Sequence, residues 1–535
     1  MSNKSFLKGA AILGIAGIIV KIMGAFFRIP LGNIIGDTGF GYYQASYPIY
    51  VMLLTISTAG IPTAISKLVS EKNAAGDRYG AHRVFKVSFI LLFVIGIVTS
   101  SILFFGAKAI VNLVKSPGAY YSMVAISPAL LFVPIMAAYR GYFQGLQDMT
   151  PTAISQVIEQ FGRVVVGLGL AILLLDRGLE IATAGASFGA AAGAIAGTLI
   201  IMYIYFKRRE KIRMEITGGV EYPQEPSGKI VNKLLAIAIP ITIGASIMPV
   251  MNMIDLAIVM RRLQAVGFTY AEANDLYGQL TGFAASIINL PQILTVALAM
   301  SLVPAISDAS HRRNLSLIQS TVQTGTRIAL LIGLPAGVGL ITLAKPIMLL
   351  LYPLKAESAA SAAGALAILG SGIIFLTLVQ TFTGILQGLG RPTVPVINLF
   401  IGAIFKIILT YILTGIPAIN VKGAAFGTIT AYGTAALLNF FAVRRLTKTK
   451  FSPVNFIVKP MIAVGAMGIT VLFAYSQLEP LMGGKLATVG TIGIGGLIYG
   501  LMLLVTGGIT KEDFEMMPGG RKLAKLLSSL GLLRR

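Results

Sequence analysis

Long apolar runs are the feature that most constrains this 535-residue chain. Crossing the hydrocarbon core of a bilayer takes roughly 20 apolar residues, and such runs recur from one end of the sequence to the other. They lack the polar–apolar alternation of a barrel wall, and an open sheet cannot lie in lipid. We therefore expect an all-α polytopic membrane protein with 14 transmembrane helices, at residues 6–30, 39–70, 83–106, 119–146, 151–175, 182–207, 230–263, 273–307, 316–343, 357–388, 393–415, 421–443, 454–475 and 486–507.

Charge supports this class and orients the chain. Only 12% of the residues are charged, whereas a soluble domain has about 25%. The net charge is +23, but the basic residues gather in short loops such as Lys67–Lys86 and Arg444–Lys450. This pattern is typical of cytoplasmic loops that face anionic lipids, not of nucleic-acid binding. It places both termini in the cytoplasm and the protein in the cell membrane.

The polar stretch at residues 208–229 divides the chain. We expect a six-helix bundle on each side of this cytoplasmic linker, at residues 1–207 and 230–445. Residues 446–507 supply helices 13 and 14, and residues 508–535 form a cytoplasmic amphipathic tail suited to the inner leaflet. The N-terminal run is interrupted by a lysine and lacks a cleavage site, so we interpret it as a retained first helix rather than a signal peptide.

The two bundles resemble each other in sequence. Gly141–Pro151 aligns with Gly384–Val394, and the same offset places Arg163 on Lys406. Ile61–Ser66 also echoes Val303–Ser307. Six spans separate the members of each pair, so the repeats run in the same direction and are related by an axis along the membrane normal. Two such bundles around a central cavity are typical of a transporter.

No motif points to bond-making chemistry. The chain has no Cys, and it contains no P-loop, zinc-protease or EF-hand pattern. Gly185–Gly189 fits the G-x-S-x-G nucleophile pattern, but the repeat places Ala425 where Ser187 stands. We therefore interpret both segments as small-residue packing sites between helices. The sequence predicts that the protein is not an enzyme.

The first span carries the most informative polar residues. Lys21 and Arg28 lie on one helical stripe with Gly14, Gly17 and Gly24. Cations this deep in a bilayer are costly and usually functional. We interpret them as cations that face a wet cavity, with small residues giving a substrate room. The alternative is close helix packing through the glycines, with the cations reaching the outer interface.

Further charged residues fall within or at the ends of other spans. Glu159 and Arg163 form an i,i+4 pair, which either faces the cavity or locks the first bundle as an internal ion pair. Lys406 has glycine at i−4, and the remaining acids are Asp37 and Asp255. Cations outnumber acids when Arg140 and Arg327 are included. The cavity should therefore attract an anionic substrate, and a phosphate or diphosphate suits Arg and Lys donors.

These residues resemble those of a known family. The opening LKGAAILGIAGIIVKIMGAFFRIPLGNIIGDTGFGYYQ and the segment YRGYFQGLQDMTPTAISQVIEQ are similar to the MOP exporter superfamily, and most to the YtgP/SpoVB branch of MurJ-type lipid II flippases. The resemblance implies that Lys21 and Arg28 engage the diphosphate of a lipid-linked sugar. The family also uses an arginine in helix 8, which is absent here, so Arg163 and Lys406 are the candidates to supply that charge.

The resemblance carries two further implications. Helices 13 and 14 should form a groove for the lipid tail. Some members bind sodium in the C-terminal bundle, and Asp255 and Asn398 would contribute here, although Gly402 stands where a second acid is expected.

We therefore expect a flippase that moves an undecaprenyl-diphosphate-linked oligosaccharide, foremost the peptidoglycan precursor lipid II, from the inner to the outer leaflet. No cofactor is expected, and the membrane potential, protons or sodium would couple transport. Three alternatives remain open: a flippase for another polyprenyl-linked unit such as teichoic acid or capsule, a cation-coupled multidrug exporter, and a membrane glycosyltransferase.

Overall fold

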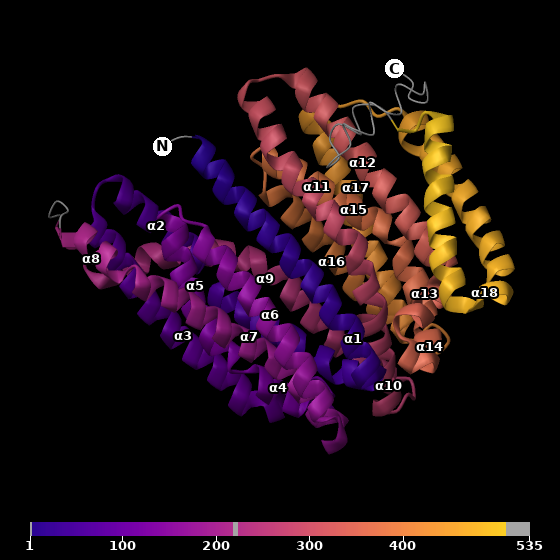
Figure 1. The fold of residues 1–535 in the computed structure, drawn as a ribbon, viewed down its shortest axis with the longest axis horizontal. Coiled ribbons are helices and arrows are strands. Elements are labelled where there is room, and N and C mark those ends of the chain that lie inside the picture. The colour runs from indigo at the N-terminus through magenta and orange to yellow at the C-terminus, as the bar shows by residue number, and fades with distance from the viewer. Residues whose placement is uncertain (1–2, 218–222, 510–535) are drawn as a thin grey trace. The chain divides into compact units, whose positions relative to one another are not determined.

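The computed structural model describes residues 3–217 and 223–509. These residues form helices and contain no strand, which confirms the all-α prediction. The α-helices are α1 (Asn3–Thr58), α2 (Ile61–Ala74), α3 (Arg78–Leu113), α4 (Tyr120–Ile126), α5 (Ala129–Gly145), α6 (Thr150–Leu173), α7 (Leu179–Lys207), α8 (Arg209–Thr217), α9 (Ser227–Ala265), α10 (Tyr270–Gly278), α11 (Ala285–His311), α12 (Leu315–Thr342), α13 (Ala344–Leu351), α14 (Ala356–Ser371), α15 (Ile373–Gly388), α16 (Thr393–Thr414), α17 (Lys422–Thr447) and α18 (Lys459–Thr506) (Figure 1). Short helical turns join them at η1 (Pro117–Ala119), η2 (Leu175–Arg177), η3 (Gln279–Ala284), η4 (Pro353–Lys355) and η5 (Val454–Val458).

Every expected span has a counterpart among the described helices. Eleven helical segments are long and apolar enough to cross a membrane, and the bent pair α14–α15 makes a twelfth. Two of these segments each contain two expected spans, because α1 breaks at Gly36 and α18 breaks at Gly483. Both glycines have a positive φ, 67° and 76°, which a residue with a Cβ atom rarely adopts. The two halves of α18 then lie side by side (Figure 1).

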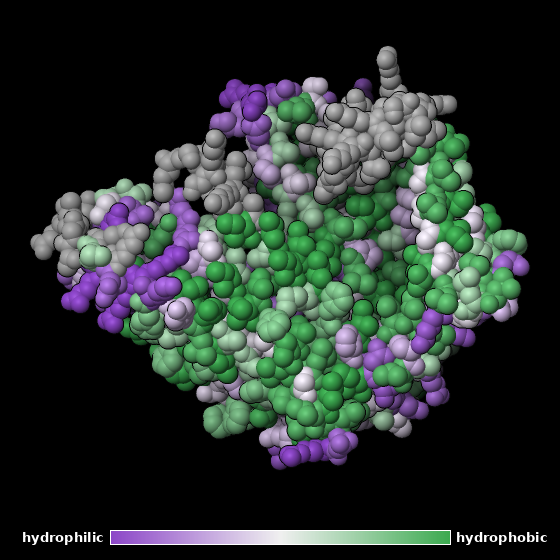
Figure 2. Space-filling view, viewed as in Figure 1, coloured by the Kyte–Doolittle hydropathy of each residue, from purple (hydrophilic) through white to green (hydrophobic). Residues whose placement is uncertain are grey.

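The outer faces of the helices are apolar, as lipid requires. Large side chains such as Phe105, Leu173 and Leu497 are 80%, 74% and 71% exposed. Figure 2 shows hydrophobic residues covering the helices, with hydrophilic residues gathered near helix ends and loops. A soluble protein rarely exposes contiguous apolar patches of this kind. The chain is a multi-pass membrane protein.

The described chain forms two compact units, which run from Met1 to Gly278 and from Gln279 onward. The first unit therefore includes α9 and α10, which the repeat assigned to the second bundle. In this unit the Gly60 amide donates to Thr242 Oγ1 at 3.2 Å, and Asn274 Nδ2 donates to the Thr38 carbonyl at 2.9 Å. The boundary between the units falls at η3, a π-helical turn. The repeat-based division at residues 208–229 remains a prediction, and part of that linker forms α8. Nearly all of the predicted tail lies outside the described residues.

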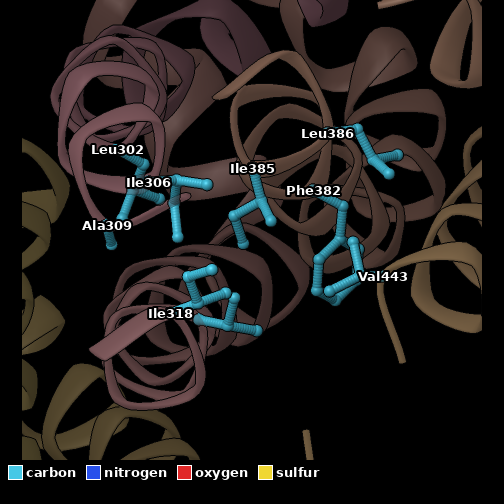
Figure 3. Close-up of a cluster of buried hydrophobic side chains, with 9 residues drawn as sticks. Leu302, Ile306, Ala309, Ile318, Phe382, Ile385, Leu386 and Val443 are labelled. Atoms are coloured by element: carbon cyan, nitrogen blue, oxygen red, sulfur yellow. The ribbon is translucent and has the colours of Figure 1, made fainter. Parts of the chain in front are cut away.

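A packed core holds the second unit together. Leu302, Ile306 and Ala309 of α11 face Ile318 of α12, and these side chains meet Phe382, Ile385 and Leu386 of α15 and Val443 of α17 (Figure 3). All of these residues are at most 7% exposed. Burying each large apolar side chain stabilises the unit by about 1.5–3 kcal/mol. Val394 of α16, the helix that carries Asn398 and Lys406, packs against this core.

The sequence repeat reappears as a repeat of packing. In the first unit, a Cβ atom placed on Gly189 of α7 would lie 2.7 Å from the Arg163 carbonyl oxygen of α6. In the second unit, a Cβ on Gly427 of α17 would lie 3.0 Å from the Lys406 carbonyl oxygen of α16. The two helix pairs thus approach through corresponding residues, which confirms small-residue packing at both glycine motifs.

One part of the sequence alignment is shifted. A Cβ on Gly145 would lie 2.9 Å from the Ser66 carbonyl oxygen, whereas one on the matching Gly388 would lie 2.8 Å from the Val303 carbonyl oxygen. Ser66 therefore corresponds to Val303, four residues before the Ser307 that the motif comparison paired with it. The difference is one helical turn, which a short run of shared residue types does not resolve.

Candidate functional site

The N-terminal half of α1 presents its small residues to open space. No described atom lies within 4 Å of a Cβ placed on Gly14 or Gly17, and one on Gly24 would meet only Gln160, at 3.7 Å. Lys21 is exposed and Arg28 is half-buried on the same stripe. Gly14 and Gly17 therefore do not serve close helix packing within the first unit. A Cβ atom would fit at each of the three glycines with no contact shorter than 3.7 Å.

Arg28 and Arg163 both lie within electrostatic range of one tyrosine of the first unit. Both guanidinium groups interact electrostatically with Tyr43, which lies in α1 beyond the Gly36 break and is only 4% exposed. The Tyr43 ring stacks on Tyr47 with centroids 5.8 Å apart and tilts against Phe27 at 6.2 Å. The break at Gly36 thus folds α1 back so that its second half connects a cation of the first half to a cation of α6.

Glu159 and Arg163 belong to a larger charged cluster than the sequence indicated. The Arg163 guanidinium lies 3.8 Å from Glu159 Oε1, while Arg140 of α5 donates to Glu159 Oε2 at 3.0 Å. Arg140 also donates from Nε to Ser155 Oγ at 2.8 Å. The side chains of the three charged residues are between 15% and 18% exposed. Sequence spacing identified the pair on α6 but gave no signal that Arg140 joins it.

Asp37 lies apart from this cluster in its contacts. It follows directly after the Gly36 break, where α1 and α10 approach closely. A Cβ atom on Gly278 of α10 would lie 2.0 Å from the Asp37 carbonyl oxygen. The structure thus gives Asp37 a place in the packing of the first unit, and a role in substrate binding remains a prediction.

In the second unit, Lys406 lies on α16 one turn after Gly402. A Cβ on Gly402 would lie 2.4 Å from the Ala431 carbonyl oxygen, so the side of α16 that carries Gly402 packs tightly on α17. Asn398 Nδ2 donates to Asn439 Oδ1 at 2.8 Å, and Asn439 is fully buried. The second unit therefore places a neutral amide pair at Asn398, two turns before Lys406 on α16.

The structure gives the predicted sodium ligands other contacts. Hard cations are held by several oxygen ligands, but the Asn439 oxygen already accepts a hydrogen bond from Asn398. Gly402 supplies no side-chain oxygen, and a larger residue there would collide with Ala431. Asp255 lies on α9 of the first unit, where it interacts electrostatically with Tyr277. No group of three or more His, Cys, Asp or Glu residues that could hold a metal occurs in the described parts of the chain, and a sodium site at Asp255 and Asn398 remains a prediction.

The second unit also contains an apolar groove of about 420 Å³. It lies between α11, α12, α13 and both halves of α18. Its lining is almost entirely apolar, with Leu290, Pro335, Ile347, Val471 and Ile492 among the residues. A groove with this lining suits a hydrocarbon chain and offers nothing to hold a charged group.

Comparison with known proteins decides the family. Residues 6–310, more than half of the chain, match the family described as "Polysaccharide biosynthesis protein". The chain belongs to the polysaccharide biosynthesis protein family. Residues 280–412 also match the MatE family. Both matches agree with the predicted membership of the MOP exporter superfamily, which is confirmed.

Relatives of this polysaccharide biosynthesis protein span nearly its whole length. The uncharacterized membrane protein YabM of Bacillus subtilis is 30% identical over 97% of this chain and 96% of its own. The lipid II flippase MurJ of the same organism is 28% identical over 93% of this chain and 95% of its own. A solved structure of lipid II flippase MurJ in an inward closed conformation has a TM-score of 0.67 at 17% identity, covering 92% of this chain and 98% of that chain. The last likeness supports the fold, and the prediction of a transporter rather than an enzyme is confirmed by this family membership.

Proposed function

We propose that this polysaccharide biosynthesis protein is a flippase for a lipid-linked oligosaccharide diphosphate, foremost the peptidoglycan precursor lipid II. The presence of two guanidinium groups, Arg28 and Arg163, within electrostatic range of the buried Tyr43 is the observation that carries this proposal. Planar guanidinium groups bind phosphate oxygens through paired hydrogen bonds, which suits a diphosphate. The similarity to a protein named lipid II flippase agrees with this substrate.

The proposed mechanism assigns the charged head group to the cationic side chains and the lipid tail to the apolar groove. Lys21, Arg28 and Arg163 of the first unit bind the diphosphate of an undecaprenyl carrier, and a contact from Lys406 remains a prediction from the sequence. The polyprenyl chain stays in lipid and occupies the apolar groove beside α18. Alternating access then carries the head group from the inner to the outer leaflet of the plasma membrane. Both termini remain cytoplasmic, where the basic loops contact anionic lipids.

No cofactor is needed to drive this movement. A charge that crosses the membrane potential changes in free energy by about 2.3 kcal/mol per 100 mV. The diphosphate head group is negatively charged, so its movement outward across an inside-negative membrane is favoured. The same cations disfavour a drug-cation exporter, since a positive cavity repels such a substrate.

Alanine substitution of the α1 cations tests the proposal. Lys21→Ala and Arg28→Ala should each abolish growth rescue in cells depleted of their lipid II flippase, because a buried diphosphate would lose a charged partner. Membrane levels should stay normal. The matched control is Lys67→Ala, which removes an exposed cation paired with Glu71 at the surface and should rescue fully.

Two results would count against this proposal. Full rescue by both Lys21→Ala and Arg28→Ala would remove the role of the α1 cations. Failure of the unmodified protein to rescue, with restored export of another polyprenyl-linked polysaccharide such as teichoic acid or capsule, would replace lipid II as the substrate.

A further inference from the structure

The carboxylate of Glu159 lies between the guanidinium groups of Arg140 and Arg163, but it is closer to one of them than to the other. It accepts a hydrogen bond from Arg140 at 3.0 Å, whereas Arg163 lies 3.8 Å from its other oxygen. Arg140 is also held by Ser155, at 2.8 Å. A charge-assisted hydrogen bond is strong at about 2.7–2.9 Å and weakens beyond that. Glu159 is therefore engaged mainly by Arg140.

Arg163 therefore keeps hydrogen-bond donors that Glu159 does not use. Its Nε is buried and donates to no described acceptor, and its other electrostatic neighbours are Tyr43, Tyr47 and Tyr50. The hydroxyl of Tyr50 is likewise buried without a partner in the described chain. Arg140, Glu159 and Arg163 together carry a net charge of +1, since one carboxylate faces two guanidinium groups. Buried donors without acceptors are uncommon in folded proteins, and a ligand is one explanation.

Backbone packing keeps Glu159 in this position. A Cβ atom on Gly193 of α7 would lie 2.2 Å from the Glu159 carbonyl oxygen. The helices α6 and α7 therefore touch at Glu159, so its backbone has no room to move toward α7. The relative strength of the contacts from Arg140 and Arg163 therefore determines which of them the Glu159 carboxylate pairs with.

We propose that Arg140 is a positioning residue, which holds Glu159 away from Arg163 and so reserves the charge of Arg163 for the substrate diphosphate. This inference rests on the proposed function, because it requires an anionic group at Arg163. Arg140 itself touches no substrate. Without Arg140, Glu159 would pair with Arg163, and the net charge of the cluster would fall from +1 to zero.

A compensating pair of substitutions tests this role. The probe is farnesyl diphosphate, which carries the same diphosphate group, and its binding to the full chain is measured in lipid nanodiscs. Arg140→Gln should weaken binding about tenfold or more, since a unit charge is removed from the cluster in a poorly screened site. Arg140→Gln combined with Glu159→Gln restores a net charge of +1 and should return binding to within about threefold of the unmodified protein. Arg140→Lys keeps the charge and should retain most binding.

Controls separate positioning from structure. Arg208→Gln removes a guanidinium from a more exposed pair with Asp148 and should leave binding unchanged. A merely structural role for Arg140 predicts that the double variant binds no better than Arg140→Gln, and that result would overturn the inference, as would unchanged binding in Arg140→Gln. Arg163→Gln distinguishes the two proposals. If it binds normally, the proposed diphosphate site itself fails at Arg163; if it loses binding while Arg140→Gln does not, only the positioning role fails. Thermal unfolding of each variant confirms that folded protein is compared.

Discussion

The helix pairs α6–α7 and α16–α17 share one packing arrangement but differ in charge. Each pair approaches through a glycine that faces the backbone of a cationic residue, Arg163 in one unit and Lys406 in the other. One turn earlier on the first helix of each pair stands Glu159 or Gly402. The helices touch at this position in both pairs. A Cβ placed on Gly193 would lie 2.2 Å from the Glu159 carbonyl oxygen, and one placed on Gly402 would lie 2.4 Å from the Ala431 carbonyl oxygen.

The glycine at this contact lies on opposite helices in the two pairs. In α6–α7 it is Gly193, which leaves room for Glu159 on α6. In α16–α17 it is Gly402 on α16, and Ala431 stands at the position of Gly193 on α17. Only one of the two facing residues needs to lack a Cβ. A carboxylate can therefore occupy the first helix only where the second helix supplies the glycine.

The polar neighbours differ in the same way. Ser155 and Arg140 hold Glu159 in the first unit, whereas Asn398, which aligns with Ser155, pairs with Asn439 in the second. The second pair of helices thus packs without a carboxylate or a second guanidinium at this site. The charged cluster is not a requirement of the packing, which favours a functional role for it.

The largest expected effect comes from filling the shared contact. Gly193→Ala and Gly402→Ala each place a Cβ against a backbone oxygen, and overpacking of this kind costs about 1–3 kcal/mol. Ala431→Gly creates no overlap and should cost about 1 kcal/mol, the helix-propensity difference between Ala and Gly, which is at the low end of the range for the other two. Thermal unfolding in detergent measures all three. A tolerated Gly193→Ala beside a damaging Ala431→Gly would show that the two pairs do not share the contact.

Sequence alone predicted much of this arrangement and missed specific parts for physical reasons. Apolar run length fixed the spans, and helical spacing paired Glu159 with Arg163, because both signals are local. Arg140 was missed as a partner because it lies on another helix, 19 residues from Glu159. The apolar groove was expected only by resemblance, since its lining combines α11–α13 with α18, which are far apart in the chain.

A smaller effect is expected from the amide pair of the second unit. Asn398→Ala removes one neutral hydrogen bond, which contributes about 0.5–1.5 kcal/mol and in membrane proteins averages about 0.6 kcal/mol. The matched change in the first unit, Ser155→Ala, removes the neutral partner of a charged group, and hydrogen bonds to charged groups contribute about 1.5–3 kcal/mol. Unfolding midpoints compare the two. Equal losses would contradict the contrast between a charged and a neutral pair.

The smallest effect is expected at a carboxylate that also lies between two cations but in the loop that precedes α9. Glu225 pairs with Lys233 at 2.5 Å and with Lys72 at 4.0 Å; its own side chain is 14% exposed, but these lysine side chains are 46% and 30% exposed. Solvent screens such pairs, so Glu225→Gln should cost at most about 1 kcal/mol. It therefore measures how much a carboxylate between two partly exposed lysines contributes, for comparison with Glu159 between two arginines that are 15% and 16% exposed.

The pH dependence at Glu225 has a definite sign. The hydrogen bond from Lys233, aided by the charges of Lys233, Lys72 and Lys229, holds the pKa of Glu225 below its usual value. A depressed pKa in the folded protein stabilises it at pH values above the unfolded pKa of about 4.3. That contribution is lost as the pH falls through the lower folded pKa. The difference in unfolding midpoint between the unmodified protein and Glu225→Gln should therefore be present at neutral pH, shrink below about pH 4.3, and also shrink in high salt. If this difference in unfolding midpoint grew on acidification, the surroundings of Glu225 would destabilise its charged form. Glu225 could then no longer serve as the reference for Glu159.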